Sequence, residues 1–304
     1  MKRRSDRVLD GWLWFAALLA LALFMAFFIM LGTESRASVL RFGWRFVVTS
    51  VWDPVHSVFG ALPFLYGTAV TSLFALVFGG LVGVCTAVFL VYFVRGWFRS
   101  WLGGAIELLA AIPSVVYGLW GLFVLAPWLQ HTLEPWLGRW LGFLPLFQGV
   151  PYGVGYLAAG LILSVMILPT VTALSRDVLL AVPRDIHEGA LALGATTQEM
   201  ITHVALPYAR SGIISALMLG LGRAVGETIA VTMVIGNRPE ISASLFAPGY
   251  TMASVIANEF TEATTHVYLS ALYEVGLLLF LLTVAFYVVA RLFIRGIAKT
   301  EGNV

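Results

Sequence analysis

An arginine and a glutamate interrupt one of the most apolar stretches of this sequence. Residues 220–236 read GLGRAVGETIAVTMVIG, with Arg223 and Glu227 in the middle. Side chains four positions apart share one face of an α-helix, so the spacing predicts that the two charges lie together. Gly222 and Gly226 form a G-x-x-x-G on an adjoining face, where another helix could approach closely. Charges inside apolar spans usually serve a pathway, and the alternative is an ion pair that fixes helix packing.

Other kinds of reactive site are not indicated by the residue pattern. The five histidines are scattered without metal-ligand spacing, and no nucleophile is paired with a base. Cys85 is the single cysteine, so no disulfide framework exists. The ATP-binding pattern G-x-x-x-x-G-K-[ST] is absent from the sequence. We therefore expect no catalytic residue, metal or cofactor in this chain, and an energy source that is either another subunit or an ion gradient.

The composition is that of a membrane protein. Hydrophobic residues make up 60% of the 304 and charged residues 11%, whereas soluble domains are about one quarter charged. Helices satisfy their own backbone hydrogen bonds in lipid, and each apolar run here is long enough to cross roughly 30 Å of hydrocarbon. We predict an all-α polytopic membrane protein with about six transmembrane helices. The apolar runs lie near 11–32, 67–94, 104–128, 154–175, 211–236 and 268–294.

The basic residues predict the orientation of these spans. With six spans, twelve of the 18 Lys and Arg fall on one side, and five on the other. The first group is Lys2, Arg3, Arg4, Arg7, Arg95, Arg99, Arg176, Arg184, Arg210, Arg291, Arg295 and Lys299. The second group is Arg36, Arg41, Arg45, Arg139 and Arg238. Because basic residues favour the cytoplasmic side, both termini are expected in the cytoplasm.

The segment 182–210 is the least apolar part between two predicted spans. DIHE at 185–188 and TTQE at 196–199 both have the spacing of a capping box, which starts a helix. Gly194 is suited to end the first helix, and Pro207 is expected to end the second. The pattern predicts a helix, a glycine turn and a helix on the cytoplasmic side. Such a hairpin either rests on the headgroups or docks a cytoplasmic partner.

The same segment resembles the EAA loop of ABC-importer permeases. Glu188, Gly189 and Ala190 are followed after three residues by Gly194, and after nine more by VALP at 204–207. The family pattern is E-A-A, three residues, G, nine residues, I-x-L-P, so the departures are Gly189 and a valine for the isoleucine. The resemblance implies the MetI-like permease fold, with a coupling helix in a cleft of an ATP-binding subunit. The implied coupling residues are Glu188, Gly189, Ala190, Gly194, Leu206 and Pro207.

Four further stretches resemble one family of these permeases, the phosphate-specific transport permeases called PstC. They are WDPVHSVFGALPFLYGT (52–68), IELLAAIPSVVYGLWGLFVL (106–125), LGLGRAVGETIAVTMVIGN (219–237) and SLFAPGYTMASVIANEFTEA (244–263). The sister family PstA also has an arginine before G-E-T, but it continues with A-P-L rather than the Ile229-Ala230-Val231 found here. The ANEF element after the fifth span also favours PstC.

The resemblance implies import of inorganic phosphate across the bacterial inner membrane. Arg223 would offset the phosphate charge, and Glu227 would hold the guanidinium when the path is empty. The implied partners are a PstA-like second permease, a PstB-like ATPase dimer that binds the ATP, and a PstS-like periplasmic phosphate-binding protein. The implied division is 1–66 for the cytoplasmic tail, first span and periplasmic loop, 67–296 for the permease domain with its coupling loop at 184–207, and 297–304 for a cytoplasmic tail.

Three alternatives remain open from the sequence. A permease for another oxyanion, such as molybdate or sulfate, or the sister permease PstA would share the EAA loop. A channel or an ion-gradient carrier could use Arg223 as its anion site, but it has no reason to contain that loop. An intramembrane enzyme would need an acid, a base and a nucleophile facing one another, and no such set is evident.

Overall fold

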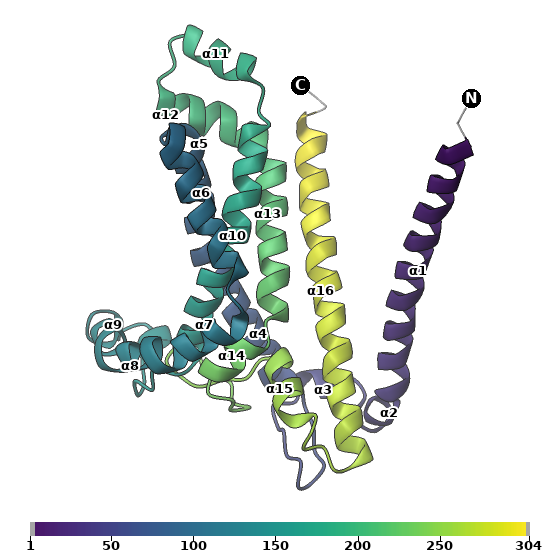
Figure 1. Cartoon of the computed structure of the whole chain (residues 1–304). Helices are drawn as coiled ribbons and strands as arrows, with labels where there is room; N and C mark the ends of the chain where they lie inside the picture. Colours follow the sequence, from purple (N-terminus) through teal and green to yellow (C-terminus); the bar gives the residue numbers. More distant parts are fainter. Residues whose placement is uncertain (1–3, 302–304) are drawn as a thin grey trace.

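Five long apolar helices and one bent pair of helices account for the six predicted spans (Figure 1). The computed structural model describes residues 4–301, with side chains described for 9–292. Within that range the chain is helical, with two isolated β-bridges and no strand. The predicted cytoplasmic tails lie partly outside the described residues, at 1–3 and 302–304. The division at 1–66, 67–296 and 297–304 stays a prediction.

The first half of the chain forms the first three spans and the short helices that connect them. Its helices are α1 (Arg4–Glu34), α2 (Arg36–Phe42), α3 (Arg45–Val48), α4 (Leu62–Ala75), the π-helical η1 (Leu76–Gly80), α5 (Leu81–Tyr92), α6 (Gly96–Ala111), α7 (Ser114–Trp120), η2 (Gly121–Leu125), α8 (Ala126–Trp128), η3 (Leu129–Leu133), α9 (Glu134–Leu141) and the short η4 (Pro145–Phe147). Because α4, η1 and α5 are continuous, they make one span of 31 residues, Leu62–Tyr92.

The second half forms the central span, the coupling segment and the last two spans. Its helices are α10 (Tyr156–Leu180), α11 (Arg184–Ala192), α12 (Thr197–Met200), the π-helical η5 (Ile201–Ala205), α13 (Leu206–Gly226), α14 (Ile229–Val234), α15 (Met252–Glu259) and α16 (His266–Glu301). The run Thr197–Gly226 is one continuous helix of 30 residues.

Two predicted spans are broken rather than straight. The run predicted at 104–128 is divided at Ile112 and Pro113, where α6 and the helical stretch Ser114–Leu141 differ in direction by 90°. Proline removes a backbone donor and disfavours helix for the residue before it, which explains the position of the break. The run predicted at 211–236 ends as a helix at Gly226, and the short α14 follows in a new direction (Figure 1).

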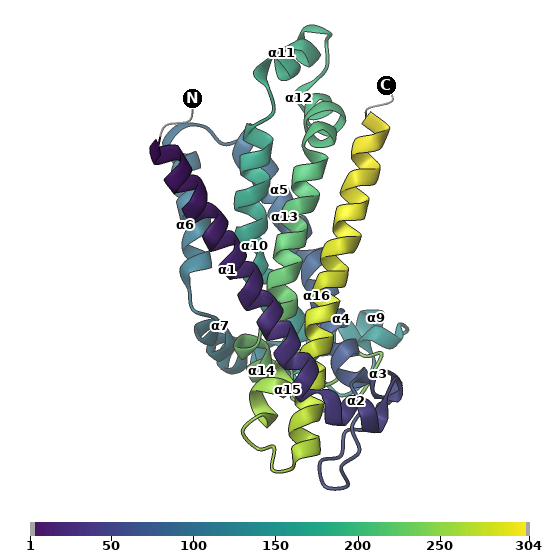
Figure 2. The same cartoon turned by 90° about the vertical axis from the view of Figure 1, so that its right-hand side faces the viewer.

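The helix α10 is the centre of the packing. Two-thirds of its most apolar window is buried, and α4–α5, α13 and α6 surround it (Figure 2). A Cβ added at Gly79 would lie 2.5 Å from the Ser164 carbonyl oxygen, so the backbones of η1 and α10 are almost in contact. Slightly farther along, the Thr172 hydroxyl donates a hydrogen bond of 3.2 Å to the Gly83 carbonyl. The span 62–92 and α10 therefore form a tightly joined pair.

The ends of the spans on the side opposite α11 are covered by segments that bind one another (Figure 1). The Glu259 carboxylate accepts hydrogen bonds from Trp52 Nε1 at 2.7 Å and from the Tyr268 hydroxyl at 2.6 Å. Asn258, also in the ANEF element, donates to the Tyr250 hydroxyl at 3.0 Å. The segment 237–267 thus packs onto the loop before α4 and the start of α16.

The first span is attached mainly at its outer end. The Ser270 hydroxyl in α16 donates to the Glu34 carbonyl at 2.7 Å and accepts from the Ser38 backbone N–H at 3.1 Å. Only 6% of the most apolar window of α1 is buried inside this chain. Lipid or a second subunit is therefore expected to cover most of α1.

The described ends of α1 and α16 lie at the same end of the bundle as α11, and α9 lies at the opposite end (Figures 1 and 2). Combined with the charge bias, this arrangement predicts that reporters fused at Thr300 and within 132–150 report the cytoplasm and the periplasm, respectively. The measurement is the ratio of a cytoplasm-active to a periplasm-active reporter. Equal reporter ratios at both positions would show that the orientation is wrong.

Gly79→Ala should destabilise the protein, because the added methyl has no room beside the Ser164 carbonyl. Overpacking of this kind costs about 1–3 kcal/mol. The measurement is thermal unfolding of the detergent-solubilised protein. Gly104→Ala is the matched control, since a Cβ at Gly104 meets nothing within 4 Å. An equal unfolding temperature for the two variants would contradict the close packing of η1 on α10.

Candidate functional site

Arg223 is in the last turn of α13 and faces α10. Its Nη1 donates a hydrogen bond of 3.2 Å to the Thr170 hydroxyl, and the contact is partly buried. Arg223 lies 13 residues beyond Arg210, which is predicted to lie near the cytoplasmic surface, so it is roughly 20 Å along the helix from that residue. The structure therefore places a cation deep in the bundle, beside the Thr170 hydroxyl.

Glu227 does not continue the helix that contains Arg223, so the prediction of a shared helix face was wrong. The helix ends at Gly226, and Glu227 has extended backbone angles of φ −69° and ψ 123°. Its carboxylate accepts a hydrogen bond of 3.2 Å from the Ala230 N–H in the first turn of α14. The two described side chains make no ion pair within 4.0 Å. A carboxylate at a helix N-terminus satisfies a free donor and the helix dipole, which accounts for its position.

The two helix breaks meet beside Arg223. The short helix α14 packs against α7, and a Cβ added at Gly118 would lie 2.5 Å from the Met233 sulfur. Pro113 has no N–H to offer the Leu109 carbonyl, and the Tyr117 hydroxyl donates to that carbonyl at 2.8 Å instead. Interrupted helices are tolerated within a bundle where side chains replace the lost backbone bonds. Tyr117 and Thr170 were missed from the sequence, although the proline four residues before Tyr117 was a usable signal.

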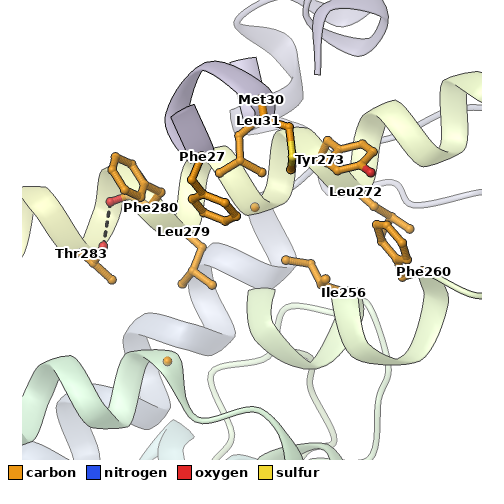
Figure 3. A pocket seen from close by; sticks show the side chains of 12 residues that line it. Phe27, Met30, Leu31, Ile256, Phe260, Leu272, Tyr273, Leu279, Phe280 and Thr283 are labelled. Atoms are coloured by element: carbon orange, nitrogen blue, oxygen red, sulfur yellow. Dashed lines mark hydrogen bonds between the residues drawn. The ribbon is translucent and has the colours of Figure 1, made fainter. Parts of the chain in front are cut away.

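The predicted G-x-x-x-G contact is not made by any described helix of this chain. A Cβ at Gly222 or Gly226 meets nothing within 4 Å. Each glycine instead borders an apolar hollow beside α16, of about 260 Å³ at Gly222 and about 420 Å³ at Gly226. Figure 3 shows side chains of α1, α15 and α16 around the larger hollow, among them Phe27, Ile256 and Phe280. This face of α13 is open in the isolated chain.

The coupling segment largely follows its predicted pattern. Gly194 has φ of +90°, a conformation that other residues rarely adopt, and it ends the turn after α11. Thr196 and Glu199 form the predicted capping box, with the Thr196 N–H donating to the Glu199 carboxylate at 2.8 Å. The box predicted at 185–188 is absent because Pro183 precedes the helix and Asp185 lies inside its first turn. In the first turn its carboxylate still interacts favourably with the helix dipole.

Pro207 was predicted to end the second helix of this segment, and that prediction was wrong. The helix continues from α12 through the π-helical turn Ile201–Ala205 into α13, where Pro207 occupies the first turn. A π-helical turn shifts the register of the backbone hydrogen bonds. Pro207 then occupies the first turn of α13, where the N–H that proline lacks is least needed. The coupling segment is therefore directly continuous with the span that holds Arg223.

The motif residues divide between two faces of α11. Glu188 and Gly189 are exposed, as are the neighbouring Leu191 and Leu193, the latter with 91% of its surface accessible. Ala190 points inward and packs against the apolar cluster of Met200, Ile201 and Ala205. The outward face of α11 thus ends in two exposed leucines, while its inward face packs on the chain itself.

Comparison with known proteins assigns the chain to a family. The family model described as "Binding-protein-dependent transport system inner membrane component" matches residues 75–299. The chain belongs to this family. A protein named phosphate transport system permease protein PstC from Pasteurella multocida is 44% identical over 95% of this chain and 91% of its own length. A protein of the same name from Mesorhizobium japonicum is 44% identical over 94% of this chain and 89% of its own length.

Solved structures of ABC transporters share the fold. A bacterial alginate ABC transporter aligns with a TM-score of 0.63 at 18% identity and covers 98% of this chain and 99% of its own. The MetNI methionine ABC transporter aligns with a TM-score of 0.56 at 17% identity and covers 77% of this chain and 94% of its own. The predicted all-α MetI-like permease fold and the resemblance to PstC are confirmed. The chain is the multi-pass membrane component of an ABC importer, which works with an ATPase and a binding protein.

Gly194→Val should disturb the coupling segment, because a β-branched residue at positive φ is strained. We expect weaker association with the ATPase subunit, or weaker substrate-stimulated ATP hydrolysis, with normal insertion of the chain. Co-purification and ATPase assays measure the two effects. Gly189→Ala is a suitable control, because nothing lies within 4 Å of its Cβ position and the family pattern has alanine there. Unchanged coupling in Gly194→Val would contradict the assigned role of the turn.

Proposed function

We propose that this chain is the PstC-type permease subunit of an ATP-driven importer of inorganic phosphate. The observation that carries the proposal is 44% identity to PstC proteins over about 94% of the chain. The coupling segment and the deep, partly buried Arg223 are consistent with it. The chain itself is a transport subunit rather than an enzyme.

The proposed assembly has four kinds of subunit. A PstA-like permease pairs with this chain, a PstB-like ATPase dimer binds ATP at the cytoplasmic face, and a PstS-like binding protein delivers phosphate from the periplasm. The coupling residues are Glu188, Gly189, Ala190, Gly194, Leu206 and Pro207. No cofactor is expected in this chain, because ATP is held by the ATPase. Both termini would then face the cytoplasm, and the complex would lie in the bacterial inner membrane.

Arg223 is proposed as the residue that offsets the charge of phosphate during passage. Orthophosphate carries one to two negative charges, and moving an ion of this kind from water into hydrocarbon without a partner costs tens of kcal/mol. A guanidinium stays charged in such surroundings and binds two phosphate oxygens at once. Placing it at this depth costs about 2.5–3.5 kcal/mol on insertion scales. An apolar side chain could make a packing contact alone without this free-energy cost of insertion.

The structure changes the proposed role of Glu227. Its carboxylate caps α14 and is not paired with Arg223, so it would compete for the guanidinium only if the two helix ends rearrange. We propose that this exchange occurs during transport: Glu227 leaves the end of α14 and pairs with Arg223 once phosphate has moved on. The two helix breaks would provide the local freedom for such a movement.

Arg223→Gln should abolish phosphate uptake while the complex still assembles, because glutamine is polar and fits the space of arginine but carries no charge to offset that of phosphate. Uptake of radiolabelled phosphate into proteoliposomes measures the effect. Arg95→Gln is the matched control, since Arg95 is exposed at the cytoplasmic end of α6. Normal uptake by Arg223→Gln would leave only a packing role for the guanidinium.

Glu227→Gln separates the capping role from the transport role in the same assay. Glutamine retains a carbonyl oxygen that accepts from the Ala230 N–H, so the start of α14 should persist. We expect lower uptake, because a neutral amide competes poorly with phosphate for Arg223. Full uptake by this variant would show that Glu227 only caps α14.

Competition decides between phosphate and other oxyanions. Excess sulfate or molybdate should leave phosphate uptake unchanged, and uptake should require ATP inside the vesicle rather than an ion gradient. Inhibition by sulfate or molybdate would favour the alternative permease, and uptake without ATP would favour a gradient-driven carrier.

A further inference from the structure

The coupling helix has an attachment to the membrane spans that lies outside its sequence motif. Tyr92 is the last residue of α5, and His187 lies in α11. The Tyr92 hydroxyl and His187 Nε2 share a partly buried hydrogen bond of 3.1 Å. The two rings also make an edge-to-face contact, with centroids 5.7 Å apart. This contact joins residues that are 95 positions apart in the sequence.

The chain connections of α11 are poorly suited to transmit a rotation on their own. Pro183 precedes α11 and Gly194 follows it at positive φ, so the helix is separated from its neighbours at both ends by turns. No residue of α11 is buried. A rotation imposed on the exposed face of α11 therefore reaches α5 through the few side chains on the inner face of α11, among them His187 and Ala190.

The helix α5 leads from Tyr92 toward the surroundings of Arg223. Gly83 lies nine residues before Tyr92, about 14 Å along a continuous helix. The carbonyl of Gly83 accepts the hydrogen bond from Thr172 of α10. Thr172 is two residues from Thr170, whose hydroxyl accepts from Arg223. Since α5 and α10 are tightly packed, a displacement of Tyr92 would carry Thr170 with it.

We propose that Tyr92 and His187 are positioning residues that make the α5–α10 pair move together with the coupling helix. This inference rests on the proposed function. The covalent route runs from α11 through α12 and η5 into α13, which holds Arg223. The side-chain route runs from His187 through α5 to α10, which holds Thr170. When both routes act, the two sides of the Arg223–Thr170 contact receive the same displacement. When the side-chain route is lost, α13 moves alone, and ATP hydrolysis no longer drives phosphate efficiently.

The test uses the complete complex in proteoliposomes, with the partner permease, the ATPase and the phosphate-binding protein. Tyr92→Phe removes one hydroxyl and leaves the ring. Phosphate uptake and ATP hydrolysis are measured in the same vesicles. We expect the ratio of phosphate imported to ATP hydrolysed to fall about threefold to tenfold, which corresponds to the loss of one hydrogen bond. Assembly and phosphate-independent hydrolysis should stay unchanged.

Tyr208→Phe is the matched control. Tyr208 is near the start of α13, is 54% exposed, and makes no side-chain hydrogen bond within the described part of the chain. This variant should keep the wild-type ratio of phosphate to ATP.

A double variant shows whether the two residues act through each other. His187→Phe alone should lower the ratio as Tyr92→Phe does, and the double variant should lower it no further. A wild-type ratio in Tyr92→Phe, additive losses in the double variant, or loss of ATPase binding in either single variant would overturn the proposal. If the unaltered complex itself imports no phosphate, the proposed function fails, and that result is distinct from failure of the coupling link.

Discussion

The absence of water around the spans is the constraint on which the rest of this structure depends. Inside a bilayer each backbone N–H and C=O must find a partner within the protein, so an interrupted helix needs replacement partners. Two helices of this chain are interrupted, one after Ala111 and one after Gly226, and the short helices that follow them, α7 and α14, pack together. The Tyr117 hydroxyl serves a carbonyl at the first break and the Glu227 carboxylate serves an N–H at the second. Two residues of the candidate site, Tyr117 and Glu227, are therefore also required by the breaks.

Because side chains satisfy the backbone groups at the two breaks, the interior of the bundle contains polar groups without any separate ligand-binding loop. Arg223 is in the last turn of its helix, so its guanidinium is beside the break after Gly226 rather than in the middle of a continuous apolar helix. Thr170 belongs to the unbroken α10, which is the most buried span. One side of the Arg223 contact is thus anchored in the core, and the other is next to the point where the backbone changes direction after Gly226. This asymmetry suits a site that must hold an ion and then release it.

Much of the fold and of the coupling segment could be predicted from local patterns. Apolar length identified the spans, and the spacing of Thr196 and Glu199 identified a real capping box. The relation of Arg223 to Glu227 could not be found in this way, because an i, i+4 spacing has meaning only while the helix continues. The break after Gly226 has no proline to mark it. It depends on α7 packing against α14, which is a contact between distant parts of the chain.

The attachment of the first span has a consequence for how the chain is made. The Ser38 N–H bonds to Ser270, 232 residues later in the sequence. A ribosome adds about 5–20 residues per second, so Ser38 reaches the membrane roughly 10–50 s before Ser270 exists. During that interval α1 has no partner from the last span and must be stable in lipid as a lone helix, which its long apolar sequence permits. The bond between α2 and α16 can thus form only after α1 has already been placed in lipid.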